Sequence, residues 1–283
     1  MKRIKYTWLI VLVLGLALLA AGCGGEKPAD NPEESAANGE AEKTTLEQIE
    51  ENGVLVAGLD DTFAPMGYRD AETNELIGFD IDMGEELAKR LGVDIEWQPT
   101  AWDGVMGSLN SKKFDVIISG MSVTDERKEV INFSKNYVNA GIGMVVSKDN
   151  NDIKGLEDLK ALDPSEIATQ TGSSGKTACD ELGLEGVKVY DQYPEAFQDL
   201  AIGRVKAVIV DVTTAAHYIS KKPDAYKVVG DRLVEEPYAI GIRKDDADLK
   251  AAIDNALTEM IKDGTLTSIS QKWFGDDVTP KAE

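Results

Sequence analysis

The sequence predicts an α/β fold with two lobes that share a ligand cleft. Short apolar runs alternate with segments of helical periodicity, an order typical of α/β layers with mostly parallel sheets. A unit that begins at Leu109 (LNSKKFDVIIS) is echoed about ninety residues later by one that begins at Leu200 (LAIGRVKAVIV). Each unit predicts a helix end, a basic turn and a buried strand. The echo favours two lobes of similar build, although chance is the alternative because such units are common.

The composition excludes several classes of function. The 283 residues include 51 Asp and Glu against 30 Lys and Arg, which gives a formal net charge of −21. A chain this acidic lacks the cationic surface that nucleic-acid binding needs. With two cysteines and one histidine, neither a disulfide framework nor a histidine-based metal site is expected, and we predict no metal and no cofactor.

The first 22 residues have the pattern of an export signal. Lys2, Arg3 and Lys5 precede an uncharged run over residues 6–22, which is short for a membrane-spanning helix. The run ends at Cys23 in a way that resembles the bacterial lipoprotein processing site, although Ala20 stands where leucine is usual. Residues 1–22 are therefore predicted to be a lipoprotein signal peptide, with lipid attached to Cys23. An uncleaved N-terminal anchor is the alternative.

The segment after the signal predicts a disordered acidic tether over residues 23–43, because positions 24–43 hold no large apolar side chain. Cys179 is then the one thiol of the folded part. No histidine lies near it in sequence, so we expect an inert packed residue rather than a nucleophile.

Apolar runs in the remaining chain predict six strands. Between the first two runs, Met83, Leu87, Ala88 and Leu91 recur at helical spacing, and Gly92 follows as a C-terminal cap. Ligands bind at the carboxyl ends of strands in such sheets, so the loops after these runs are candidates for a site. The predicted strands are residues 54–59, 95–98, 115–119, 167–170, 207–210 and 239–243.

A loop that follows the third predicted strand can bind an anion. Thr124 is placed to cap a helix whose first turn includes Arg127. A cation is unfavourable at this end of a helix unless it binds an anion together with the free N–H groups of the turn. The alternative is an exposed arginine screened by Asp125 and Glu126.

The segment 170–177 (QTGSSGKT) ends like a phosphate-binding loop, but Gln170 stands where that motif requires its first glycine. We therefore exclude a nucleotide and expect a glycine-serine turn suited to a smaller anion, such as a carboxylate. Asp60, Phe63 and Trp102 also follow predicted strands. The two aromatic residues are either satellite core or a slot for a flat or cationic group beside the carboxylate.

Four stretches, taken in order, resemble the extracytoplasmic solute-binding proteins of polar amino-acid ABC importers. Residues 78–91 (GFDIDMGEELAKRL) resemble the signature helix of that family. Its next three landmarks are matched by residues 100–104 (TAWDG), 115–127 (DVIISGMSVTDER) and 132–137 (NFSKNY). The resemblance runs from about residue 44 to residue 274.

The resemblance implies a two-lobed, periplasmic-binding-protein-like (type II) fold with a hinge and an interlobe ligand cleft. Residues 44–138 would form the first part of lobe one and residues 139–234 lobe two. Residues 235–283 would return to lobe one, with closing helices at 247–262 and 265–274.

The resemblance also implies roles for site residues. Arg127 would bind the α-carboxylate of an amino acid, helped by the backbone of Ser122 and Ser174. Asp211 would bind the α-ammonium group. The Gly120 carbonyl and the Ser122 hydroxyl would lie beside the ammonium group. The other implied ligand contacts are Ser119, Phe63 and Trp102 around the side chain, Asp60 at its distal end, and Gln170 from lobe two.

The implied function is that of a lipid-anchored, extracytoplasmic, monomeric receptor, not an enzyme, that hands a free amino acid to an ABC permease by hinge closure. Asp60 beside two aromatic residues favours a cationic ligand such as arginine or lysine. Glutamine is the alternative ligand. A cyclohexadienyl or arogenate dehydratase on the same fold ranks lower, because residues 170–177 offer no general acid.

Overall fold

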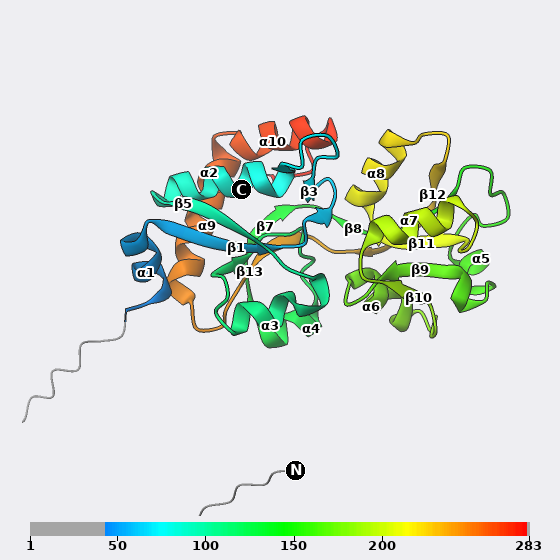
Figure 1. Ribbon diagram of the computed structural model, residues 1–283, viewed down its shortest axis with the longest axis horizontal. Coiled ribbons are helices and arrows are strands. Elements are labelled where there is room, and N and C mark those ends of the chain that lie inside the picture. Colours follow the sequence, from blue (N-terminus) through cyan, green and yellow to red (C-terminus); the bar gives the residue numbers. More distant parts are fainter. Residues whose placement is uncertain (1–42, 282–283) are drawn as a thin grey trace, which may run out of the picture. The chain divides into compact units, whose positions relative to one another are not determined.

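The computed structural model describes residues 43–281 (Figure 1). The predicted signal peptide, the lipid site at Cys23 and nearly all of the predicted tether lie outside these residues. Within the described range, no helix is both long enough and apolar enough to cross a membrane.

The first sheet has the strand order β5-β1-β6-β13-β7. Its first three strands are parallel, and β13 runs antiparallel to both of its neighbours. We call this sheet and the helices packed on it the first lobe. Its strands are β1 (Val54–Leu59), β5 (Asp94–Pro99), β6 (Val116–Ile117), β7 (Asn132–Val138) and β13 (Tyr238–Ile242).

The second sheet has the order β10-β9-β11-β8-β12 and, with its helices, forms the second lobe. Its strands are β8 (Gly141–Ser147), β9 (Ile167–Gln170), β10 (Lys188–Tyr190), β11 (Ala207–Asp211) and β12 (Tyr226–Glu235). Its helices are α5 (Leu156–Lys160), the short 3₁₀ turn η2 (Pro164–Glu166), α6 (Ser174–Glu181), α7 (Tyr193–Ala201) and α8 (Val212–Lys221).

The two sheets repeat one arrangement, which explains the internal echo of the sequence. The units that begin at Leu109 and Leu200 each end in the third strand of a sheet, β6 in one and β11 in the other. The expectation of mostly parallel sheets was wrong, because each sheet has two parallel and two antiparallel pairings. The antiparallel pairings arise from the strands that carry the chain between the lobes.

The chain passes between the two sheets twice, from β7 to β8 and from β12 to β13. The two crossings lie side by side, since the backbone N–H of Glu236 donates to the Ala140 carbonyl at 3.1 Å. Next to them, Ser122 forms an isolated β-bridge with Tyr238. The segment that carries Ser122 is therefore held against the second crossing.

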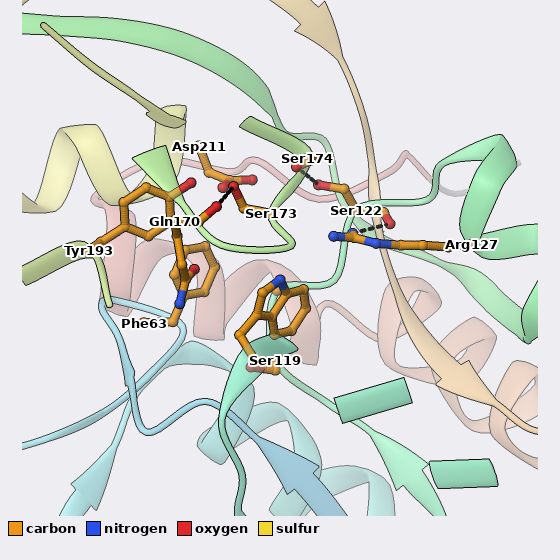
Figure 2. Close-up of a pocket in the computed structure, with 11 residues that line it drawn as sticks. Phe63, Ser119, Ser122, Arg127, Gln170, Ser173, Ser174, Tyr193 and Asp211 are labelled. Atoms are coloured by element: carbon orange, nitrogen blue, oxygen red, sulfur yellow. Dashed lines mark hydrogen bonds between the residues drawn. The ribbon is translucent and has the colours of Figure 1, made fainter. Parts of the chain in front are cut away.

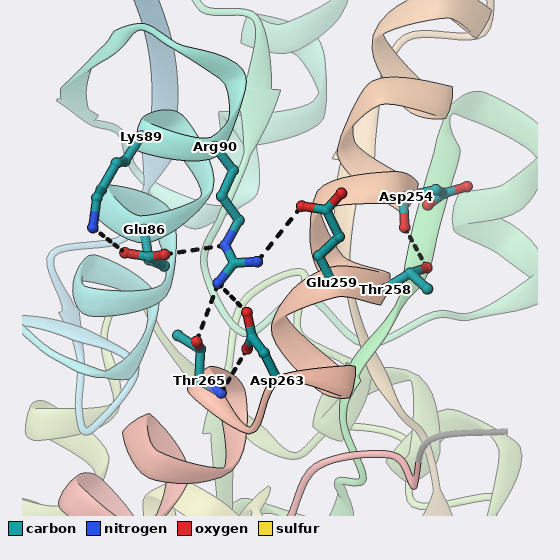
Figure 3. Close-up of polar contacts among 8 residues, drawn as sticks. All are labelled: Glu86, Lys89, Arg90, Asp254, Thr258, Glu259, Asp263 and Thr265. Carbon is teal, nitrogen blue, oxygen red and sulfur yellow. Dashed lines mark hydrogen bonds and ion pairs between the residues drawn. The ribbon is translucent and has the colours of Figure 1, made fainter.

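The predicted helix near Met83 is α2 (Phe79–Leu91), and Gly92 ends it in the left-handed conformation as expected. Helices α9 (Ala247–Lys262) and α10 (Thr265–Phe274) pack against α2. Arg90 connects the three (Figure 3): its guanidinium group pairs with Glu86 of α2 at 3.0 Å, and with Asp263 at 2.7 Å in the turn between α9 and α10.

The first lobe also contains several smaller elements. The third predicted strand is shorter than expected. At its ends, the side chains of Asp115 and Ser119 accept hydrogen bonds from β1 and the residue after it at 2.9 and 3.0 Å. The remaining elements are α1 (Thr45–Asn52), β2 (Thr62–Phe63), β3 (Gly67–Arg69), β4 (Leu76–Ile77), the 3₁₀ turn η1 (Trp102–Gly104), α3 (Val105–Asn110) and α4 (Asp125–Val130).

The core lies on both faces of each sheet. The central strands β1 and β11 are buried almost throughout, as is typical of strands covered on both sides. A separate apolar cluster lies under α3 and is built around Phe114 and Leu109. The Phe114 ring fills the space beside Gly58 of β1, so any larger side chain at position 58 would collide with it.

Candidate ligand-binding site

A small cavity lies between the two lobes (Figure 2). Both lobes supply its walls, mostly through the loops at the carboxyl ends of strands. The first lobe contributes Phe63, Trp102, Ser119, Gly120, Ser122 and Arg127. The second lobe contributes Gln170, Ser173, Ser174, Tyr193 and Asp211.

Direct hydrogen bonds hold the lobes together around this cavity. The indole N–H of Trp102 and the guanidinium group of Arg127 both donate to the Gly172 carbonyl, at 3.0 and 3.2 Å. The hydroxyls of Ser122 and Ser174 lie 3.2 Å apart across the interface. The structure is therefore closed around the cavity.

Arg127 is a buried cation at the cavity wall. Thr124 caps α4 as predicted, its hydroxyl accepting the Arg127 N–H at 3.2 Å, and the alternative of an exposed arginine is excluded because Arg127 is only 5% exposed. Its guanidinium group donates to the Ser122 carbonyl at 2.9 Å and lies 5.2 Å from the Trp102 ring centroid. Between residues 43 and 281, Arg127 forms no ion pair.

Burial and charge act against each other at Arg127. Loss of hydration lowers the pKa of its guanidinium group, whereas the negative charges of Asp211 and Glu236 favour the charged form. A buried charge that lacks an ionic partner is costly in free energy. The cavity next to Arg127 is therefore suited to an anionic group.

Asp211 lies on the opposite lobe, as the last residue of β11. It is 3% exposed, and one of its carboxylate oxygens accepts a hydrogen bond of 2.7 Å from the Tyr238 hydroxyl. Burial raises the pKa of Asp211 to about 6, while Tyr238 and Arg127 oppose the rise. At neutral pH Asp211 is mainly ionised and can bind a cationic group.

Asp60 is the one predicted site residue that does not line this cavity. Its carboxylate accepts a hydrogen bond from the Gln170 amide at 2.8 Å, so it lies directly behind a wall residue. Two hydrogen bonds from Thr62, at 2.6 and 3.0 Å, fix the other carboxylate oxygen. A second, adjoining cavity is bordered by Asp60, Asp61, Asp103 and Asp191.

The other nine predicted residues meet at the cavity, and two further residues were not predicted. Ser173 caps α6 by accepting the Lys176 N–H, and its place in the glycine-serine turn was the signal for it. Tyr193 is the first residue of α7 and lies 5.9 Å from Phe63 between ring centroids. No sequence pattern marks Tyr193.

Phe63 and Trp102 pack against apolar clusters and also line the cavity. Phe63 is 7% exposed and belongs to the apolar core, yet it also faces the cavity. Trp102 packs partly on the cluster under α3 while its indole N–H contacts the second lobe. A ligand side chain between these two residues would contact Phe63, which is fixed by its packing in the core.

No group of three or more metal-ligating side chains comes together within residues 43–281. Cys179 is buried, and burial raises the pKa of its thiol to about 12, which keeps it protonated and inert, in line with the prediction.

Comparison with known proteins identifies the family. The model for bacterial extracellular solute-binding proteins, family 3, matches residues 55–276. The chain belongs to this family. The L-cystine-binding protein of Escherichia coli K12 is 36% identical over 242 residues, which cover 84% of this chain and 89% of that protein. The lysine/arginine/ornithine-binding periplasmic protein of the same strain is 33% identical over 231 residues, covering 78% and 87%.

Solved structures of this family share the two-lobed fold. An ancestral arginine-binding protein, solved once with arginine and once with glutamine, has a TM-score of 0.73 to this chain at 43% identity. The match covers 79% of this chain and 99% of that chain. The family and these named relatives are binding proteins rather than enzymes.

Proposed function

We propose that this protein binds a free amino acid with a cationic side chain, such as arginine or lysine, between its lobes and delivers it to an ABC importer. The observation that carries the proposal is Arg127, which is 5% exposed at the cavity wall and forms no ion pair with any residue from 43 to 281. An α-carboxylate is the small anion that would pair with it.

The carboxylate would lie between Arg127 and the start of α6. Arg guanidinium groups bind carboxylates with two parallel hydrogen bonds. Ser174 is the first residue of α6, so free backbone N–H groups and the positive end of the helix dipole face the same region. Ser122 and Ser174 add hydroxyls from each lobe.

The α-ammonium group would bind Asp211. Gly120 and Ser119 line the same cavity from the first lobe and offer backbone carbonyls. A zwitterion would then connect a cation of the first lobe to an anion of the second. Because both partners are in place only when the lobes are closed, the ligand would stabilise the closed state.

The charge around the cavity supports a cationic side chain. Asp211 and Glu236 provide two carboxylates near the Arg127 guanidinium group, and the adjoining cavity is bordered by four aspartates, of which Asp60 contacts Gln170. A ligand with net charge +1 offsets more of this excess than a neutral one does. The relatives that bind lysine, arginine and ornithine, or arginine, agree with this choice.

Glutamine remains the second candidate ligand, because the Gln170 amide in front of Asp60 can pair with another amide. The ancestral arginine-binding protein was solved with glutamine as well as with arginine. A dehydratase is disfavoured, since Gln170, Ser173 and Ser174 supply no acidic proton from the second lobe.

A thermal-shift screen tests the proposal, with the twenty amino acids, ornithine, citrulline and cystine as ligands. A ligand at 100 times its Kd stabilises the folded state by about 2.7 kcal/mol. We expect arginine or lysine to raise Tm, and agmatine, which is arginine without its carboxylate, to leave it unchanged. A shift with glutamine alone would replace the cationic ligand. No shift with any of them, or formation of phenylpyruvate from prephenate or arogenate, would overturn the proposal.

We also propose that lipid on Cys23 holds the protein at the outer face of the cell membrane and that it acts as a monomer beside its permease. The uncharged run over residues 6–22 and the small residues before Cys23 support this anchor. In cells, Cys23→Ala should move the protein from the membrane fraction to the soluble fraction. Retention in the membrane fraction would favour an uncleaved N-terminal anchor instead.

A further inference from the structure

The carboxylate of Asp80 is buried behind the cavity, and none of the proposed ligand contacts involves it. Asp80 is the second residue of α2 and is 0% exposed. It does not line the cavity, and it forms no ion pair with any residue of the described chain. Acids are almost never fully buried without a partner cation, so its position requires a reason.

The one hydrogen bond of the Asp80 carboxylate points to the site. Its Oδ2 accepts the backbone N–H of Gly120 at 2.6 Å, and Gly120 lines the cavity. In a trans peptide the carbonyl and N–H point in opposite directions, so the Ser119 carbonyl points away from Asp80. The carboxylate thereby fixes the orientation of the peptide that joins Ser119 and Gly120.

Packing allows this peptide little freedom. Gly120 has a φ of +52°, which favours glycine, and a Cβ there would lie 2.7 Å from the Phe63 ring and 3.0 Å from Met66. The Asp80 backbone N–H donates to the Met66 carbonyl at 2.8 Å. Asp80, Gly120 and Phe63 are therefore connected through a single packed unit that ends at the cavity.

The second oxygen of Asp80 faces the start of the first crossing. Asp80 Oδ1 and the Tyr137 hydroxyl are both buried, and neither makes a hydrogen bond of normal geometry. They nevertheless lie close enough for the hydroxyl to favour the ionised carboxylate. Tyr137 stacks on Phe79 at 6.0 Å between ring centroids and belongs to β7, one residue before that strand ends.

We propose that Asp80 is a positioning residue for the ammonium group of the ligand. Its negative charge orients the peptide between Ser119 and Gly120 and attracts the ammonium group through that peptide. Tyr137 supports the same carboxylate from the hinge side. This inference rests on the proposed function, because it needs a ligand cation at the Ser119–Gly120 wall.

Asp80 ionises in a pH range where its effect on ligand binding can be measured. Burial raises the pKa of Asp80 to about 7, and the nearby Tyr137 hydroxyl and the hydrogen bond from the Gly120 N–H oppose the rise. Tyr137 is the titratable group that faces Asp80 from a neighbouring element. The other charged groups packed against α2 have different partners. Lys272 of α10 pairs with Asp82, and Asp263 of the α9–α10 turn pairs with Arg90. A bound ammonium group would lower the pKa of Asp80, so binding would release protons near pH 7.

Calorimetric titration of the wild type and Asp80→Asn with L-arginine tests the inference. Titrations from pH 5.5 to 8.5 in buffers of different ionisation enthalpy count the protons released. In the wild type, affinity should rise with pH through steps near 6 and near 7, which belong to Asp211 and Asp80. Asp80→Asn should lose the upper step and bind about tenfold more weakly at pH 8, as expected for one unit of pKa coupling.

Asp82→Asn is the matched control, since Asp82 lies on the same helix and contacts Lys272 and Trp273 away from the cavity. It should keep both steps. If Asp80→Asn does not fold, Tyr137→Phe supplies the test, because loss of the hydroxyl should move the upper step to higher pH. An unchanged pH profile in the variant that folds would overturn the inference. Failure of the wild type to bind any amino acid would instead overturn the proposed function.

Discussion

The Tyr238 hydroxyl donates a hydrogen bond of 2.7 Å to the Asp211 carboxylate and thereby joins the two lobes. Tyr238 is the first residue of β13 in the first lobe, and Asp211 is the last residue of β11 in the second. The same hydroxyl lies 2.9 Å from the Thr213 hydroxyl. The residue that follows the second crossing thus orients the carboxylate that we propose for the ammonium group.

Replacement of Tyr238 by Phe should weaken ligand binding in a pH-dependent way. Without this hydrogen bond, the pKa of Asp211 should rise above its value of about 6, because the bond favours the ionised form. Binding of arginine at pH 7 should then weaken by about tenfold, a typical effect of one hydrogen bond to a charged group, and should recover in part at pH 8.5. Calorimetry at both pH values measures this.

Tyr226→Phe is the control for that variant. Tyr226 is also buried, but its hydroxyl donates to the Phe197 carbonyl within the second lobe, away from Asp211. It should leave the affinity and its pH profile unchanged. A loss of affinity in Tyr238→Phe that is the same at both pH values would contradict the role in ionisation.

Arg127→Ala should weaken binding of every amino-acid ligand by at least about thirtyfold, since loss of one partner of a buried charge pair costs roughly 2–5 kcal/mol. Lys128→Ala is the matched control, because Lys128 is the next residue of α4 and pairs with Asp125 at the surface. Calorimetry compares the two variants. Wild-type affinity in Arg127→Ala would mean that the carboxylate binds elsewhere.

Asp60→Asn should change the choice of ligand more than the strength of binding as such. Arginine should lose about tenfold in affinity because the attraction to its cationic end is removed, while glutamine should change by less than about threefold. Asp61→Asn serves as the comparison, because Asp61 pairs with Arg69 at 2.9 Å. Equal losses for arginine and glutamine would argue against an electrostatic attraction between Asp60 and the side chain of the ligand.

Asp80→Asn should make the protein more stable at pH 8 even though it binds less well. The pKa of Asp80 is about 7 in the folded protein and 3.8 without burial, so the folded state binds this proton more tightly than the unfolded state. The ionised carboxylate therefore lowers stability progressively as pH rises from about 4 to 7, by up to roughly 4 kcal/mol.

Urea unfolding at pH 5 and pH 8 measures this difference. The gain from Asp80→Asn should be on the order of 2 kcal/mol or more at pH 8 and should be much smaller at pH 5. A variant that loses both stability and affinity at pH 8 would show that Asp80 supports the fold and has no separate role in binding.

Local patterns in the sequence predicted much of the fold. They also predicted Arg127, one of the two charged residues that we propose for the ligand. The helical spacing that ends at Gly92 is the structure's α2, and the capping signal at Thr124 placed Arg127 in a first helical turn. Such signals depend on a few neighbouring residues. The antiparallel strands were missed because strand direction in a sheet depends on how the chain crosses between the lobes.

Residues that act through tertiary contacts gave no such signal. Sequence patterns indicated only that Asp211 follows a strand. Its role in binding the ammonium group was implied by the family resemblance. Asp80 lies in the quoted signature segment, but its contact with Gly120 joins positions forty residues apart, and Tyr193 reaches the cavity only because α7 packs beside it. Nothing in a single sequence encodes such distances directly.

The Gly172 carbonyl accepts hydrogen bonds from both Trp102 and Arg127. This contact between the lobes does not depend on the side chains that would select the ligand. A main-chain oxygen is present whatever side chains surround it. Evolution can therefore exchange Phe63, Gln170 or Asp60, and so retune which nutrient is captured, without rebuilding the contact that brings the two halves together.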